Sequence, residues 1–109
     1  MHKDFNELTK RLAEIAEDEL NLANKKFPMF HSRHEGWGVL TEELWEHTNE
    51  IEMLNDYAKK IQFSIYHDGD SEELKEFAKN AYSYAIRATA EMIQVAAMCR
   101  KLIYSEVDE

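Results

Sequence analysis

The sequence of 109 residues contains little that ends a helix or begins a strand. It has three glycines, one proline and one cysteine, so few of its positions favour turns. Ala, Leu, Glu, Lys and Met dominate the rest, and these residues form helices readily. We therefore predict an all-α protein with one domain over residues 1–109, an antiparallel helical bundle in which a long helical hairpin is joined by an N-terminal helix.

Further absences limit location and partners. No apolar run approaches the roughly 20 residues that a membrane helix needs, and the first residues lack the apolar segment of a secretion signal. The lone Cys99 cannot form an internal disulfide, and its apolar neighbours predict a buried thiol in a reducing compartment. The net charge of −9 disfavours nucleic-acid polymers and anionic membranes as partners. These features predict a soluble, cytoplasmic protein.

Apolar periodicity predicts three helices, over residues 4 to about 24, from 35–39 to about 66, and from about 71 to 104. Weak helix formers over residues 80–83 favour a break in the last of them. Residues 27–38 are predicted to be irregular, either as a functional loop or as an apolar cap on the bundle, formed by Phe27, Met29 and Phe30. Residues 67–71 are predicted to form a turn, in which Gly69 adopts a positive φ and Asp70 caps the last helix.

An acidic cluster lies early in the second predicted helix: Glu42, Glu43, Glu46 and Glu50. Helical spacing places the last three of these on one face, where like charges repel by about a few tenths of a kcal/mol per pair. A divalent cation would offset this repulsion, because hard cations such as Mg²⁺ bind carboxylate oxygens. A solvated acidic face is the alternative.

Glu91 is a carboxylate in the most apolar part of the last helix. Burying it unpaired costs several kcal/mol, so either a metal or an arginine, Arg87 or Arg100, is expected beside it. Glu43 and Glu46 lie about 25 residues before the predicted turn, and Glu91 lies about 23 residues after it. Each of these separations corresponds to about 35 Å along a helix. In an antiparallel hairpin the two sites are therefore predicted to lie level.

The two acidic motifs resemble the signature of a known enzyme family. Glu42-Glu-x-x-Glu46 followed by Glu91-x-x-Gln94 resembles the Glu-Glu-x-x-Glu … Glu-x-x-Asp signature of the MazG-like, all-α nucleoside triphosphate pyrophosphohydrolases. The run His31-Ser-x-His-Glu-Gly36 before them is similar to phage and prophage members. The matches cover roughly residues 27–50 and 88–103. Gln94 replaces the last Asp of the signature, and the spacing between the two motifs is longer than is usual for the family.

The resemblance implies Mg²⁺-dependent hydrolysis of a nucleoside triphosphate, often a non-standard or deoxy one, to the monophosphate and pyrophosphate, with Mn²⁺ as a substitute ion. Glu43, Glu46 and Glu91 would bind the metal, together with the amide oxygen of Gln94. Glu42 would be a further ligand or activate the water, so the catalytic residues would be Glu42, Glu43 and Glu46. Because an amide brings no charge, the activity is expected to be weak or altered unless Glu50 supplies the missing carboxylate.

Residues near the acidic helix are predicted to contact the substrate: His31, Arg33, His34 and Trp37. Lys59 is a further cation, and Trp37 or Phe30 would stack on the base or belong to the core. Apolar side chains outside the core-facing stripes predict that the chain forms an oligomer. These side chains are Phe63, Tyr66, Tyr82, Tyr84, Ile86 and Met98. The resemblance implies that the oligomer is a homodimer or homotetramer. Two other interpretations stay open, a non-catalytic interaction or regulatory module of phage origin with a degenerate metal site, and a purely structural bundle.

Overall fold

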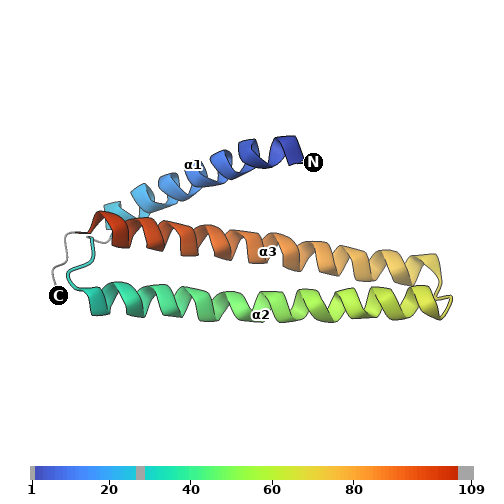
Figure 1. Ribbon diagram of the computed structural model, residues 1–109. Coiled ribbons are helices and arrows are strands. Elements are labelled where there is room, and N and C mark those ends of the chain that lie inside the picture. The colour runs from blue at the N-terminus through green and yellow to red at the C-terminus, as the bar shows by residue number, and fades with distance from the viewer. Residues whose placement is uncertain (1, 27–28, 106–109) are drawn as a thin grey trace. The chain divides into compact units, whose positions relative to one another are not determined.

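A computed structural model describes residues 2–26 and 29–105 of the chain. They form three helices, α1 (His2–Lys26), α2 (Arg33–Tyr66) and α3 (Ser71–Tyr104), and no strand is found among them (Figure 1). The all-α prediction is confirmed. The chain divides into two compact units, Met1–Leu44 with Met92–Glu109, and Trp45–Glu91. The single-domain assignment stays a prediction.

The first unit has a small core in which all three helices take part. Its buried residues are Leu20, Phe30, Ala97 and Met98, and the half-buried Ala23, Val39, Leu40 and Leu102 pack against them. Phe30 is thus a core residue, in agreement with the predicted apolar cap, whereas Phe27 lies outside the described residues. Met98 is 7% exposed, although the sequence pattern placed it among the apolar side chains that do not face the core.

α2 begins at Arg33, earlier than its sequence predicted, because two side chains cap it. The backbone N–H of Glu35 donates to Ser32 Oγ at 3.1 Å, and Glu35 Oε1 accepts from the backbone N–H of His31 at 3.0 Å. Ser32 Oγ satisfies an N–H of the first helical turn, and the Glu35 carboxylate satisfies the N–H of the residue before the cap. The helix thus starts at Arg33, two residues before the predicted range of 35–39, and residues 33–38 of the segment predicted to be irregular are helical. The motif from His31 to Gly36 forms the cap and the first turn of α2.

Gly36 allows α2 to pack closely within this unit. A Cβ atom there would lie 2.7 Å from Leu102 Cδ1 and 3.1 Å from Phe30 Cδ2. Gly38, one half-turn later on the same helix, has no such neighbour within 4 Å. Gly36 is buried and Gly38 is exposed, so only the first glycine is required by packing.

The second unit is an antiparallel pair of helices, formed by the end of α2 and the beginning of α3. The Tyr57 ring lies between Tyr84, at a centroid distance of 5.8 Å, and Phe77, at 6.4 Å. α3 runs without a break through residues 80–83, so the predicted interruption is wrong. There the Asn80 side-chain amide donates to the Glu76 carbonyl at 3.0 Å, a bond made within the helix.

The turn between α2 and α3 has the predicted place and cap. Asp70 Oδ1 accepts from the backbone N–H of Glu73 at 2.8 Å. The positive φ falls on Asp68, at 52°, and not on Gly69 as predicted. Gly69 is needed for space, because its Cβ would lie 2.1 Å from Ser64 Oγ while its N–H donates to the Ser64 carbonyl at 2.8 Å.

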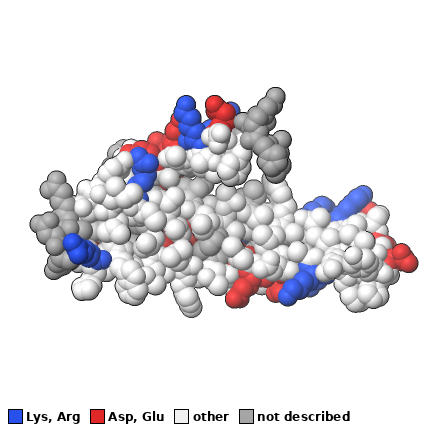
Figure 2. All heavy atoms as spheres, in the orientation of Figure 1, with Lys and Arg blue, Asp and Glu red and all other residues white. Residues whose placement is uncertain are grey.

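Many apolar side chains remain exposed, and none of the described helices has the length and apolar composition needed to cross a membrane. Phe5 and Leu8 of α1 are 63% and 52% exposed. The prediction of a buried Cys99 is wrong: Ala97 and Met98 occupy the buried side of α3, and Cys99 is exposed. Figure 2 shows a face on which charged side chains are sparse over α2 and α3.

We expect Gly36→Ala to be less stable than Gly38→Ala by about 1–3 kcal/mol, the usual range for overpacking. Both substitutions add the same helix propensity, so the difference between them isolates the contact of the added methyl group with Phe30 and Leu102. Urea unfolding followed by circular dichroism measures both. Equal stabilities would contradict a packing role for Gly36.

Candidate metal centre

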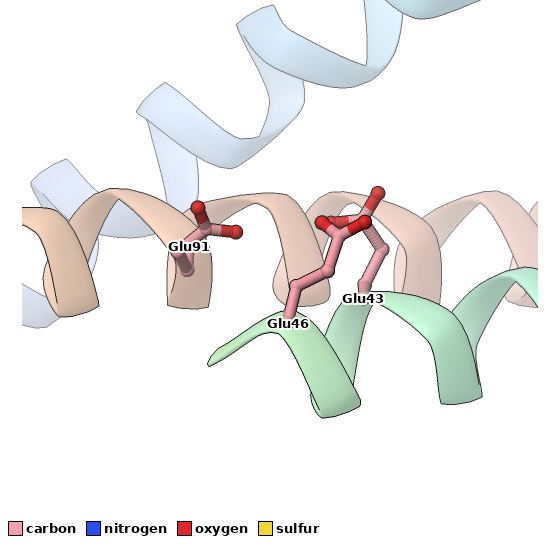
Figure 3. Close-up of side chains that lie close together, drawn as sticks. All are labelled: Glu43, Glu46 and Glu91. Atoms are coloured by element: carbon pink, nitrogen blue, oxygen red, sulfur yellow. The ribbon is translucent and has the colours of Figure 1, made fainter. Parts of the chain in front are cut away.

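The structure brings Glu43, Glu46 and Glu91 together. One carboxylate oxygen of each lies within 4.8 Å of the others. Figure 3 shows Glu43 and Glu46 on α2 and Glu91 on α3. Counting residues from the turn predicted this level arrangement of two motifs that are far apart in the sequence.

The surroundings of these carboxylates make their repulsion significant. Glu43 and Glu91 are half-buried, while Glu46 is exposed. Like charges at this separation repel more strongly where water is partly excluded. Oxygen-only ligands from two facing helices are a usual way to bind a hard divalent cation. The donor set therefore fits Mg²⁺ or Mn²⁺.

The arginines that could have neutralised Glu91 have other contacts. Arg100 forms an ion pair with Glu17 of α1. The Arg87 guanidinium lies over the Tyr84 ring, 5.2 Å from its centroid. No ion pair between Glu91 and either arginine is found among the described residues.

Two other glutamates of the acidic motif lie near this group without belonging to it. Glu50, one turn after Glu46, is half-buried and has a buried Oε2 for which the described residues supply no hydrogen-bond partner. Such an atom is costly to leave without a partner. Glu42 is exposed, which leaves its carboxylate accessible to water.

Gln94 has a different environment from the one that the motif implies. Its Nε2 donates to Glu19 Oε2 of α1 at 2.9 Å, in the first unit. This bond ties α3 to α1. The predicted role of the Gln94 amide oxygen as a metal ligand stays a prediction.

The predicted substrate residues lie at the start of α2. His31 precedes the Ser32 cap, and Arg33, His34 and Trp37 are exposed in the first helical turns, Trp37 by 68%. His31 lines a cavity of about 510 Å³ in the first unit, with Phe30 in its wall. Lys59 lies about 20 Å along α2 from Glu46 and lines a separate cavity in the second unit.

The first unit also contains a buried ionisable residue, Lys101, that the sequence pattern did not indicate. Lys101 is 5% exposed and lines the same cavity as His31. A lysine in the last turn of a helix ordinarily interacts with the helix dipole while its ammonium stays in water. Nothing in the local sequence distinguishes Lys101 from that common case.

Comparisons of the chain with family models, curated proteins and solved structures find no match. The resemblance named above rests on the two acidic motifs and the run before them. The geometry of the carboxylates is independent of that resemblance.

We expect Mg²⁺ or Mn²⁺ to raise the melting temperature, by about 5 °C when the ion is at about ten times its dissociation constant. Glu91→Gln should abolish this rise, because it removes one of the three converging carboxylates. Without metal, the same variant should melt about 1–3 °C higher than the unsubstituted protein, since a repulsion is relieved. Differential scanning calorimetry with EDTA and with added metal measures both effects.

Glu52→Gln is the matched control, because Glu52 is an exposed glutamate of α2 outside the group. It should respond to metal as the unsubstituted protein does. A protein whose melting is indifferent to millimolar Mg²⁺ and Mn²⁺ would contradict the metal centre.

Proposed function

We propose that this protein is a nucleoside triphosphate pyrophosphohydrolase that depends on Mg²⁺, for which Mn²⁺ can substitute. The observation that carries the proposal is the convergence of Glu43, Glu46 and Glu91 within 4.8 Å. The resemblance of the same residues to the MazG-like signature supports it. The products are the nucleoside monophosphate and pyrophosphate.

The residues have distinct roles in this proposal. Glu43, Glu46 and Glu91 would hold the ion, which would offset the charge of the phosphate oxygens. Glu42, exposed and adjacent to Glu43 in the chain, accepts a proton from the attacking water. A bond forms between the water oxygen and the α-phosphorus, the bond from that phosphorus to the bridging oxygen breaks, and pyrophosphate leaves.

Glu50 takes the place of the missing fourth carboxylate in this scheme. It lies on the same face of α2 as Glu43 and Glu46, and its buried Oε2 has no hydrogen-bond partner among the described residues. The position where the signature has Asp is occupied by Gln94, which is engaged with Glu19. We therefore assign Gln94 a structural role and Glu50 a supporting one beside the metal.

The proposal includes a cytoplasmic location and a homo-oligomer, either a dimer or a tetramer. Support for the oligomer comes from large apolar side chains that one copy of the chain leaves exposed, such as Phe63 at 63% and Tyr82 at 68%. Exposed apolar residues in this number favour contacts between copies.

The alternative is a non-catalytic interaction or regulatory module. The hydrogen bond of Gln94 to Glu19 favours it, because a position that is acidic in the resembling enzymes here joins two helices. In that case the acidic group is a remnant, and the exposed apolar residues of α1 would serve a partner protein.

An assay of pyrophosphate release from standard, deoxy and modified nucleoside triphosphates with Mg²⁺ tests the proposal. At least one triphosphate should turn over, and Glu43→Gln and Glu91→Gln should remove the activity. Glu42→Gln should lower kcat by about 10²–10⁴-fold, the usual contribution of a general base. It should retain the stabilisation by Mg²⁺, because Glu42 lies outside the group of three carboxylates.

Glu52→Gln again serves as the control and should retain full activity. No turnover of any triphosphate, together with normal stabilisation by Mg²⁺, would reject the enzyme and retain the metal centre. Loss of the Mg²⁺ response in Glu42→Gln would instead make Glu42 a metal ligand.

A further inference from the structure

A cavity of the second unit lies beside the turn between α2 and α3. Its volume is about 430 Å³, within the range usual for ligand pockets. Its lining comes from the last two turns of α2, the turn itself and the beginning of α3, all within one unit. The cavity therefore does not depend on how the two units are placed.

Ser64 is the unusual member of this lining. The residue is 4% exposed, and its buried Oγ has no hydrogen-bond partner among the described residues. A hydroxyl within a helix can donate to the carbonyl four residues earlier, as Thr89 does to Ala85 at 2.8 Å, but Ser64 makes no such bond. Because a buried hydroxyl without a partner is costly, a ligand that bonds to Ser64 would complete its environment.

The charges of the lining favour an anion. Two lysines, Lys59 and Lys60, and one carboxylate, Glu73, give it a net charge of +1, in a chain whose net charge is −9. Lys60 Nζ lies over the Tyr57 ring, 4.5 Å from its centroid. No ion pair or ring contact of Lys59 is found in the described ranges of the chain. One negative charge would balance the lining, whereas a second would be repelled by Glu73 without a cation to offset it.

Aromatic rings form the apolar part of the lining. The rings of Phe63 and His67 stack with a centroid distance of 3.9 Å, and His67 Nδ1 donates to the Phe63 carbonyl at 2.9 Å. Phe77 of α3 lines the same cavity. Phe63 remains 63% exposed, so part of this aromatic surface is available to a ligand. A flat apolar body packs against such rings, and a small inorganic anion does not.

The side chain of Glu73 lies next to the Ser64 hydroxyl. A Cβ atom on Gly69 would touch Ser64 Oγ and lie 3.0 Å from Glu73 Oε2, so both oxygens flank one point beside the turn. Glu73 is exposed, and its side chain can therefore rotate into solvent. That rotation makes room beside the hydroxyl for another carboxylate.

We propose that this cavity binds a small aromatic carboxylate, a flat ring system with one carboxylate group. The Ser64 hydroxyl donates to a carboxylate oxygen, and Lys59 pairs with its charge. The ring system packs against Phe63 and Phe77, while Glu73 turns toward solvent. This inference does not rest on the proposed hydrolysis, because none of the three converging glutamates lines the cavity.

Binding is measured on the full chain in EDTA by isothermal titration calorimetry with 2-naphthoate. 2-Naphthamide has the rings without the charge, and acetate and inorganic phosphate have the charge without the rings, so each should bind more weakly by about tenfold or more. In ¹³C-histidine NMR the His67 resonance, assigned with His67→Gln, should shift on binding. That of His31, which lies in the first unit, should not.

Ser64→Ala should weaken 2-naphthoate binding by about tenfold or more, the effect of losing a hydrogen bond to a charged group. Without ligand it should melt higher by about 5 °C, because a buried hydroxyl without a partner is removed. Ser83→Ala is the matched control, since Ser83 is a half-buried serine of α3 in the same unit, outside the cavity. It adds the same helix propensity and should bind normally.

Glu73→Gln should tighten 2-naphthoate binding by about threefold, because it removes the repulsion between two carboxylates. Glu72→Gln is its control, since Glu72 is an exposed glutamate of the same helical turn that does not line the cavity. It should bind as the unsubstituted protein does.

Any of three results would overturn the proposal: no shift of His67 at millimolar 2-naphthoate, the amide or phosphate binding as tightly as 2-naphthoate, or unchanged binding in a folded Ser64→Ala. Should Ser64→Ala fail to fold, Glu73→Gln and the comparison of ligands on the unsubstituted protein still decide. Because no triphosphate or metal is present, a failure here leaves the hydrolase proposal untouched.

Discussion

The ring of Phe30 has contacts of three different kinds in the first unit, and the local arrangement depends on all of them. It packs with Leu20 and the end of α3, it limits position 36 of α2 to glycine, and it lies beneath the ammonium of Lys101. The backbone N–H of Phe30 donates to the buried Ser105 Oγ at 3.1 Å, which fixes the chain just before α2. The ring of Phe30 thus takes part in the core, in the packing at position 36 and in the wall of a cavity, while its backbone N–H anchors the segment that precedes α2.

The acidic group depends on a different constraint, the continuity of the two long helices. Glu46 and Glu91 belong to helical segments that leave the same turn, so each uninterrupted turn of helix adds the same rise to both. A kink in either segment would displace one carboxylate from the other.

Sequence patterns predicted the parts of the structure that follow from helical periodicity. The bounds of α3, Ser71–Tyr104, agree with the prediction, and the level placement of Glu91 needed only a count of residues. The start of α2 was missed because Ser32 and Glu35, polar residues that also suit a loop, form a cap there. The buried Lys101 could not be predicted, since its burial depends on Phe30, which is distant in the sequence. Local patterns thus specify helices well, and contacts between distant residues poorly.

The exposure of Cys99 has a consequence for the handling of the protein. It is the single thiol of the chain, and it faces solvent on α3 beside Met98. Two copies in aerated buffer can be joined covalently through this position, with dissolved oxygen as the oxidant. An oligomer measured without a reducing agent would then reflect oxidation as well as apolar association. The same thiol offers a point for attaching a spectroscopic probe without any substitution.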